Sequence, residues 1–396
     1  KPMSVKILHV ISSCEPKKGG PIEGIKQLNK YYGKFKIKAH LLCSDKKNDK
    51  WIKDKRLPKV FAMGPKYFNY AYNPKMILWL EKNINKYDLI IVNGIWQYHN
   101  YAVWKVAKKY HKPYFVFTHG MLDPWFKKKY FLKHIKKFLY WKLIQYKILK
   151  DAKSILYTSH EEKKLAKQSF FPFRFKEKVI GYGIEGNKHK VIKKNNLFLK
   201  RFPKIYNKKI ILYFGRIHEK KGVDILIKSF SRISNQNKKF HLVVAGPYDK
   251  IIILKLKKLN KIYNLNKSVT FTGPLFDKLK WHSFLAAHVF CLPSHQENFG
   301  IAVAEALSSK KPVIITNKVN IFKTIKNNSA GIVTKNNLIS FSLGLKKFLQ
   351  LNKYEYQKYS VNSFRCFLEN FQIKPVAKNL SKYIKKHLNK YDNNKK

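Results

Sequence analysis

Two glutamates eight positions apart mark the stretch of this sequence best suited to chemistry. Residues 295–307 read His-Gln-Glu-Asn-Phe-Gly-Ile-Ala-Val-Ala-Glu-Ala-Leu, so an aromatic residue, a glycine and several small residues separate Glu297 from Glu305. The apolar run at 289–292 predicts a buried strand, and a helix pattern begins near Gly300. We therefore expect Glu297 in a strand-to-helix loop and Glu305 inside the helix.

The spacing of the two carboxylates argues against a hydrolytic pair. At a rise of 1.5 Å per helical residue, the span separates them by roughly 10 Å. Carboxylates that flank one glycosidic bond stand closer, about 5–9.5 Å apart. We expect Glu297 and Glu305 to hold two parts of one long ligand, which the free N–H groups at the helix start would also face.

A second loop joins cations to a helix start. Residues 214–222 read Phe-Gly-Arg-Ile-His-Glu-Lys-Lys-Gly, between a strand pattern and a helix pattern. Arg216 and Lys221 suit a diphosphate there, and the glycines permit close approach of the backbone. The alternative, a basic surface loop, suits Lys221 alone better than Arg216, one of only six arginines. Gly19 and Gly20 open an earlier helix and could also approach a phosphate, although most glycine pairs mark only a turn.

Alternating strand and helix patterns must position these loops. The alternation fills the first 160 residues and restarts near residue 210. This order predicts two parallel α/β sheets with a cleft between them and ligands beyond the carboxyl ends of the strands. We predict an N-terminal domain over 1–184, a linker over 185–208 and a C-terminal domain over 209–374. A Lys-rich amphipathic helix over 375–396 is expected to cross back to the N-terminal domain.

Composition excludes several classes of protein. A chain of 396 residues with 45% hydrophobic residues is long enough for two cores and is not disordered. No apolar run approaches the roughly 20 residues of a membrane-spanning helix, and no signal peptide is expected. The scattered cysteines, which form no CxxC pair, are expected to be buried free thiols rather than a disulfide or a zinc site. They are Cys14, Cys43, Cys291 and Cys366.

The net charge of +61 predicts attraction to anions. An AT-rich genome explains an excess of lysine equally well. Among functional partners an anionic membrane is favoured over nucleic acid, because the arginine fork that reads bases is scarce. Residues 124–150 hold nine lysines and no acid, interleaved with aromatic residues. This pattern suits a helix lying on an anionic membrane, and the alternative is a half-buried helix with snorkelling lysines.

Together, these motifs resemble family 4 retaining glycosyltransferases. The Gly-Gly-Pro loop, the basic loop at 214–222 and the two-glutamate stretch occur in the family's order over essentially the whole chain. The resemblance implies the GT-B fold, with two facing Rossmann-like domains and a cleft between them. The segments Asn93-Gly-Ile-Trp-Gln-Tyr and Thr118-His-Gly-Met-Leu-Asp-Pro-Trp resemble the subgroup that builds bacterial exopolysaccharide, capsule or lipopolysaccharide.

The resemblance also implies residue roles. The implied catalytic residues are His119, Arg216, Lys221 and Glu297, and the implied donor-binding residues are Gly19, Gly20, Asn298, Phe299, Gly300 and Glu305. Arg216 and Lys221 would neutralise the departing diphosphate of a nucleotide sugar. Glu305 would bind the ribose, and Glu297 with the following backbone would hold the sugar. His119 would lie near the point of transfer. The sequence departs from the family at 181–183, where Gly-Tyr-Gly replaces the common Pro-Asn-Gly, and it has His288 in place of an aspartate.

The implied activity is that of a retaining, metal-independent hexosyltransferase. A nucleotide diphosphate sugar is its substrate, no cofactor is expected, and the acceptor is a lipid-linked saccharide. The protein would be cytoplasmic and peripheral on the inner face of the plasma membrane, which it would contact through 124–150, without a specific nucleic-acid partner. Two alternatives stay open. One is a non-catalytic binder of anionic membranes or nucleic acid on a GT-B scaffold, and the other is a GT-B enzyme with a soluble acceptor.

Overall fold

The computed structural model describes residues 4–234 and 238–393 and forms two compact units. The N-terminal unit comprises residues 1–185 and 373–396, and the C-terminal unit comprises residues 186–372. The predicted N-terminal domain and C-terminal helix include residues 1–3 and 394–396, which lie outside the described residues. Each unit is a parallel sheet covered by helices, as the alternating sequence pattern predicts.

The N-terminal unit contains a seven-stranded parallel sheet in the order β3-β2-β1-β4-β5-β6-β7. Its strands are β1 (Val5–Ile11), β2 (Ile37–Cys43), β3 (Lys59–Ala62), β4 (Leu89–Asn93), β5 (Tyr114–Phe117), β6 (Ser154–Tyr157) and β7 (Glu177–Val179). The strand order reverses between β1 and β4, so the loops that follow these two strands diverge there. Such a switch point is where open α/β sheets bind ligands.

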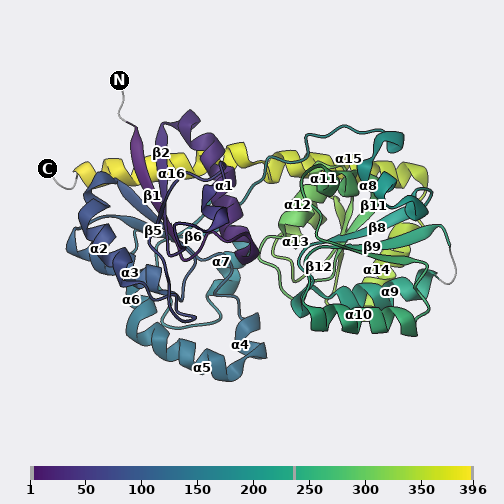
Figure 1. The fold of residues 1–396 in the computed structure, drawn as a ribbon, viewed down its shortest axis with the longest axis horizontal. Helices are drawn as coiled ribbons and strands as arrows, with labels where there is room; N and C mark the ends of the chain where they lie inside the picture. Colours follow the sequence, from purple (N-terminus) through teal and green to yellow (C-terminus); the bar gives the residue numbers. More distant parts are fainter. Residues whose placement is uncertain (1–3, 235–237, 394–396) are drawn as a thin grey trace. The chain divides into compact units, whose positions relative to one another are not determined.

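Helices cover both faces of this sheet (Figure 1). On one face lie α1 (Gly20–Tyr32) and α16 (Ile373–Asn393), and on the other α2 (Pro74–Asn83), α3 (Tyr98–Lys109) and α6 (Tyr146–Asp151). The C-terminal helix α16 packs against the core beneath α1 through Ala377, Leu380 and Ile384. That core includes Leu28 and Phe115. The end of the chain is therefore part of the N-terminal unit.

The C-terminal unit contains a six-stranded parallel sheet in the order β10-β9-β8-β11-β12-β13. Its strands are β8 (Lys209–Phe214), β9 (Phe240–Ala245), β10 (Val269–Gly273), β11 (Ala287–Leu292), β12 (Val313–Thr316) and β13 (Gly331–Thr334). In Figure 1, α9 (Val223–Ser234), α10 (Lys250–Ile262) and α14 (Leu338–Leu349) cover one face, and α11 (Asp277–Ala286), α12 (Ile301–Ser308) and α15 (Lys353–Asn370) cover the other. The short helix α13 spans Phe322–Asn327. The order reverses between β8 and β11, and because these two strands are neighbours, their carboxyl ends lie side by side.

The stretch 185–208, expected to be a linker, is folded onto the C-terminal unit from residue 186 onward. The short helix α8 (Leu197–Arg201) buries Phe198, and its cap residue Asn196 donates from its side-chain amide to the carbonyl of His282 at 3.0 Å. The many Lys and Asn residues suggested a free connection. A few apolar residues at helical spacing are enough to anchor the segment.

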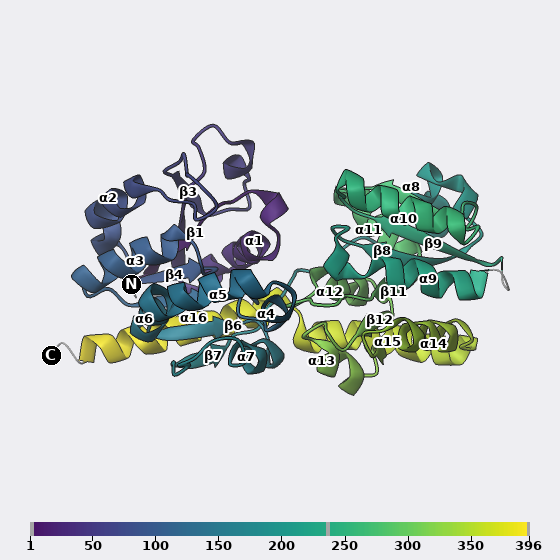
Figure 2. The same cartoon turned by 90° about the horizontal axis from the view of Figure 1, so that it is seen from below.

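The segment 124–150, expected to be one basic aromatic helix, is broken into parts. It contains α4 (Trp125–Lys129), α5 (Phe131–Tyr140), a π-helical turn at Trp141–Gln145 and the start of α6. Trp141 is fully buried and stacks on Phe170, so one face of the second half of the segment packs into the core. In contrast, α4 and α5 lie at the outer edge of this unit, nearest the viewer in Figure 2. Within the described ranges, no helix is long and apolar enough to cross a membrane.

Candidate active site

The loops after β8 and β11 touch each other in the C-terminal unit. The main-chain N–H of His295 donates to the carbonyl of Lys220 at 2.7 Å. Gly222 has a φ of 66°, and a Cβ there would lie 2.2 Å from the carbonyl oxygen of Pro293. Gly222 is therefore required both by its backbone conformation and by the close approach of the two loops.

This approach pairs Lys221 with Glu297, whose side chains form an ion pair at 16% and 15% exposure. Burial lowers the pKa of Lys221 to about 7, helped by the positive charges of Lys220 and Arg216. The Glu297 carboxylate opposes that shift because it favours the charged ammonium. Arg216 is exposed just after β8, and its backbone carbonyl accepts from the hydroxyl of Tyr213 at 2.9 Å. The loop therefore presents a partly buried, paired cation beside an exposed one.

The loop that carries Glu297 is held by the chain after β12. The N–H of Glu297 donates to the carbonyl of Lys318 at 2.9 Å, and its carbonyl accepts from Asn320 at 3.0 Å. Gly300, with a φ of 80°, caps α12, so Glu297 precedes the helix as predicted. Phe299 is buried against Phe371. The side chain of Phe299 anchors the loop. The loop's backbone is therefore available for the role that the resemblance implies, which is to hold the sugar.

Glu305 lies inside α12, as predicted, and is 6% exposed. One of its carboxylate oxygens accepts from Nζ of Lys280 on α11, at 2.5 Å. The ammonium of Lys280 also lies 5.6 Å from the ring centre of Phe214 and 5.1 Å from that of Trp281. Sequence reasoning missed Lys280, since one lysine among so many carries no signal of its partner.

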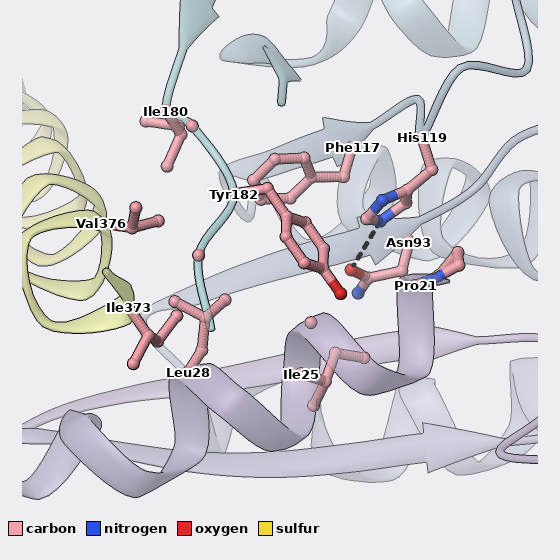
Figure 3. Close-up of a pocket in the computed structure, with 13 residues that line it drawn as sticks. Pro21, Ile25, Leu28, Asn93, Phe117, His119, Ile180, Tyr182, Ile373 and Val376 are labelled. Atoms are coloured by element: carbon pink, nitrogen blue, oxygen red, sulfur yellow. Dashed lines mark hydrogen bonds between the residues drawn. The ribbon is translucent and has the colours of Figure 1, made fainter. Parts of the chain in front are cut away.

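In the N-terminal unit, the sheet edge carries a chain of hydrogen bonds between neutral groups. His119, at a φ of 48°, reaches the side-chain oxygen of Asn93 at 3.3 Å. The amide nitrogen of Asn93 lies 3.2 Å from Nδ1 of His9, whose Nε2 lies 2.8 Å from the hydroxyl of Tyr32. Burial lowers the pKa of both histidines to about 3, so both are neutral at pH 7. Figure 3 shows His119 and Asn93 facing Pro21 and Tyr182.

A buried carboxylate fixes the loop that carries His119. Glu162, in the first turn of α7 (His160–Ala166), accepts from the hydroxyl of Thr118 at 2.7 Å and from the N–H of Gly120 at 2.6 Å. Its second oxygen accepts from the N–H and the hydroxyl of Thr158, at 2.7 and 2.6 Å. Because Thr118 and Gly120 flank His119, this clamp holds the histidine in its left-handed conformation. Sequence reasoning missed Glu162, and also Asn93 as a partner of His119.

The two glycines at the start of α1 differ in whether the structure requires glycine at their position. Gly19 has a φ of 84°, a conformation that favours glycine. Gly20 is the first residue of α1, and a Cβ there would meet no atom within 4 Å. Its carbonyl accepts from the hydroxyl of Tyr182 at 2.9 Å. The chain itself therefore requires glycine at the first position and not at the second.

One group of possible metal ligands lies near this loop. Among the described residues, Cys14, Cys43 and Asp45 bring their ligand atoms within 4.8 Å of one another. The carboxylate of Asp45 already accepts from the hydroxyl of Ser13 and the N–H of Cys14, both at 2.6 Å, and from the ammonium of Lys66 at 3.0 Å. The pKa of the Cys14 thiol is raised by its hydrogen bond to Cys43 and by burial. A protonated Cys14 thiol beside a carboxylate that already accepts three hydrogen bonds suits a hydrogen-bonded cluster better than a cation. All four cysteines are free and buried, as predicted.

The candidate residues thus fall into two sets. Arg216, Lys221, Glu297 and Glu305 line the strand ends of the C-terminal unit with residues 298–300. The N-terminal unit holds Gly19, Gly20 and His119 at its own strand ends. Each set gathers where the strand order of its sheet reverses.

Comparisons with known proteins show similarity over the C-terminal half. Residues 196–363 match the family model described as glycosyl transferases group 1. Mannosylfructose-phosphate synthase of Agrobacterium fabrum is 32% identical over 123 residues, which are 30% of this chain and 27% of that protein. The capsular polysaccharide biosynthesis glycosyltransferase CapM of Staphylococcus aureus is 28% identical over 149 residues, which are 36% of this chain and 37% of that protein. The chain thus spans about a quarter to two fifths of these relatives' lengths.

Solved structures match nearly the whole chain. A sucrose-phosphate synthase from Thermosynechococcus elongatus superposes with a TM-score of 0.80 at 16% identity, covering 96% of this chain and 98% of that one. The Anabaena protein Alr3699/HepE, in complex with UDP and glucose, superposes with a TM-score of 0.78 at 16% identity, covering 96% of this chain and all of that one. These matches confirm the predicted GT-B fold with its two parallel α/β domains. The match to the family model lies within the C-terminal unit.

Proposed function

We propose that the protein is a retaining hexosyltransferase that moves a hexose from a nucleotide diphosphate sugar to a saccharide acceptor. The observation that carries the proposal is the cradle of Arg216, Lys221, Glu297 and Glu305 within the matched glycosyltransferase domain. Cations at one end of the cradle suit a diphosphate, and buried carboxylates suit hydroxyl groups. A nucleotide sugar presents both kinds of group along one molecule.

The cations take the role of stabilising the leaving group. As the bond between the anomeric carbon and the phosphate oxygen breaks, negative charge develops on the diphosphate, and Arg216 and Lys221 neutralise it. The acceptor hydroxyl forms the new bond to the anomeric carbon from the same face and gives its proton to the departing phosphate. No protein nucleophile takes part. Because two protein cations carry this charge, the reaction as proposed is independent of metal.

The carboxylates hold the two ends of the donor. Glu297 and the backbone of residues 298–300 bind sugar hydroxyls, while Glu305 accepts from the ribose. Gly20 permits the diphosphate to approach the start of α1. His119, kept neutral, offers a hydrogen bond to the sugar without placing a second positive charge beside the forming oxocarbenium-like centre.

The proposed acceptor is a lipid-linked saccharide in exopolysaccharide, capsule or lipopolysaccharide synthesis. The exposed apolar residues of α5 and the lysines around them support contact with an anionic membrane, on the cytoplasmic side where nucleotide sugars are made. The similarity to CapM, a capsular polysaccharide biosynthesis glycosyltransferase, supports such a pathway.

The test uses the purified full-length protein. Thermal unfolding is followed with UDP, GDP or heparin, each at low and high salt, and donor hydrolysis is then measured with a panel of nucleotide sugars. We expect one nucleoside diphosphate to raise the Tm at low concentration and its sugar conjugate to be hydrolysed. A response to heparin alone, abolished by salt, would instead show a non-catalytic polyanion binder.

A further inference from the structure

Helix α5 carries one lysine whose surroundings differ from those of its neighbours. Nζ of Lys137 lies 5.0 Å from the ring centre of Trp96 and 5.8 Å from that of Phe126. Lys137 is half-buried, whereas Lys133 and Lys136 on the same helix are exposed. Burial and the charge of Lys133 lower the pKa of Lys137. The helix therefore holds an ammonium group against two aromatic rings, where cation–π attraction replaces part of its lost hydration.

The charges that lower the pKa values of two neighbouring groups here are positive. The pKa of His134 is lowered by burial and then by the charges of Lys127 and Lys137. Lys133 acts on Lys137 in the same sense. A cluster of like charges around a half-buried ammonium is unfavourable in the protein alone, and an anion placed among these groups would relieve it.

Trp96, which lies under Lys137, is in a strained conformation that its neighbours maintain. Its φ is 75°, an uncommon value for a bulky residue. Its main-chain N–H donates to the side-chain oxygen of Gln145 at 3.2 Å, and its indole N–H donates to the carbonyl of Met121 at 3.2 Å. Strain that the surrounding structure maintains in this way is typical of binding sites.

This position adjoins the proposed transfer point. Trp96 follows Asn93 by three residues, and Met121 follows His119 by two, in the loops after β4 and β5. Asn93 and His119 are joined by the hydrogen bond of 3.3 Å. A group bound at Lys137 therefore lies along the same sheet edge as the residues that face the sugar.

On its outer side, α5 and the turn after it present an apolar ridge. The ridge residues are Phe131, Leu132, Ile135, Leu139 and Leu143, which are 64%, 77%, 44%, 58% and 67% exposed. Four of them recur every four residues, so they share one face of the helix. Exposed lysines flank the ridge, which suits an acyl or prenyl chain below anionic headgroups.

We propose that Lys137, seated on Trp96 and Phe126, binds the phosphoryl group that links the acceptor saccharide to its lipid, while the apolar ridge of α5 contacts the lipid chain. This inference rests on the proposed function and names its acceptor. Lys137 positions the acceptor and takes no part in bond making. Exposed lysines such as Lys136 serve the bulk headgroups, which reach any exposed cation, whereas a half-buried ammonium suits one specific ligand.

The test compares Lys137→Gln with Lys137→Arg and with the matched control Lys136→Gln in the full-length protein. Binding of farnesyl diphosphate and of farnesol is measured by calorimetry, and binding to phosphatidylglycerol vesicles by sedimentation. We expect Lys137→Gln to weaken farnesyl diphosphate binding by about tenfold or more, as for the loss of one charge-assisted contact. Lys137→Arg and Lys136→Gln should bind it nearly as the parent protein does. Farnesol should bind weakly to all four proteins.

Two results would overturn the inference. One is equal farnesyl diphosphate affinity for Lys137→Gln and Lys136→Gln. The other is a loss in Lys137→Gln that is matched by an equal loss of vesicle binding, which would assign Lys137 to bulk headgroups. Tm values with UDP or GDP, recorded on the same proteins, separate this failure from that of the proposed function. If neither UDP nor GDP raises the Tm of the parent protein, the proposed enzyme is contradicted. If one of them does, and Lys137→Gln binds farnesyl diphosphate as the parent protein does, only the Lys137 site is contradicted.

Discussion

The strand ends of the two units differ in the charge of the side chains that they carry. In the C-terminal unit, cations and carboxylates are paired across loops and helices, as in Lys221 with Glu297 and Lys280 with Glu305. In the N-terminal unit, the corresponding edge carries His9, His119 and the amide of Asn93, and burial keeps both histidines neutral. At the C-terminal edge the candidate side chains are charged, whereas at the N-terminal edge the chain from His119 to Tyr32 is neutral and the carboxylate of Glu162 only supports the loop behind it.

The difference matches the charge that each part of a glycosyl transfer develops. A departing diphosphate gains negative charge and calls for cations held in place before the reaction. The sugar ring gains positive charge, so a neutral histidine beside it is preferable to a charged one. Under the proposed function, the cations of the C-terminal edge would stabilise the leaving group, and the neutral His119 of the N-terminal edge would contact the sugar that Glu297 also binds.

The strongest test of this division removes Arg216. We expect Arg216→Ala to lower kcat by about a hundredfold or more, because a group that stabilises the leaving group acts mainly in the transition state. Steady-state kinetics with the identified donor measure the effect. Arg232→Ala, which removes an exposed arginine of α9, is the matched control and should leave kcat unchanged. Normal turnover in folded Arg216→Ala protein would end the assignment.

A smaller effect is expected at the ribose end of the donor. Glu305→Ala should raise the donor KM by about tenfold to a hundredfold with little change in kcat, since it removes charge-assisted hydrogen bonds made equally in the ground and transition states. Glu369→Ala on α15 serves as the control because Glu369 is exposed. A fall in kcat without a rise in KM would instead indicate that Glu305 acts in the chemical step.

The carboxylate that supports the loop of His119 is expected to act through stability. Glu162→Gln replaces an acceptor of four hydrogen bonds by a group with one oxygen, so it should lower the free energy of unfolding by about 1–3 kcal/mol. The corresponding fall in Tm is measured by calorimetry, with Glu161→Gln, at the neighbouring and less buried position, as the control. Equal Tm values for the two variants would show that Glu162 does not clamp the loop of His119.

The weakest expected effect is a pH dependence of donor binding. Lys221 has its pKa lowered to about 7, so its charged form, which binds a diphosphate, is lost as the pH rises through that value. Nucleoside diphosphate affinity should therefore be highest below pH 7 and fall by up to about tenfold per pH unit above it. Bound diphosphate favours the charged form, which makes the observed slope smaller. Calorimetric titrations from pH 6 to pH 9 measure the effect.

Lys221→Arg gives the control, because arginine stays charged throughout that range. The variant should bind with an affinity independent of pH between 6 and 9. The same pH dependence in Lys221→Arg and in the parent protein would assign the titration to another group.

Local sequence patterns predicted the fold but not the side-chain contacts between residues far apart in the chain. The apolar runs placed the strands, and Gly300 marked the start of α12 because local residue types determine both features. The same local residue types did not predict which groups the candidate residues contact. Lys280 meets Glu305 across 25 positions, and Glu162 reaches Gly120 across 42. Such pairings depend on which strands become neighbours, and no local spacing encodes that.

Composition alone did not indicate which segments pack into a core. Polar composition at 185–208 indicated a linker, and aromatic-basic alternation at 124–150 indicated one surface helix. In both segments, a few apolar side chains such as Phe198 and Trp141 decide the outcome by packing into a core. Burial depends on the surface available nearby, which composition does not report.

The central claim, that Arg216 and Lys221 recognise a diphosphate, is tested most directly by calorimetric titration with nucleoside diphosphates and monophosphates. The parent protein should bind UDP or GDP more tightly than UMP or GMP. The double variant Arg216→Ala/Lys221→Ala should lose that preference, whereas Glu305→Ala should weaken both ligands equally and keep it. A diphosphate preference that survives in the folded double variant would contradict the account.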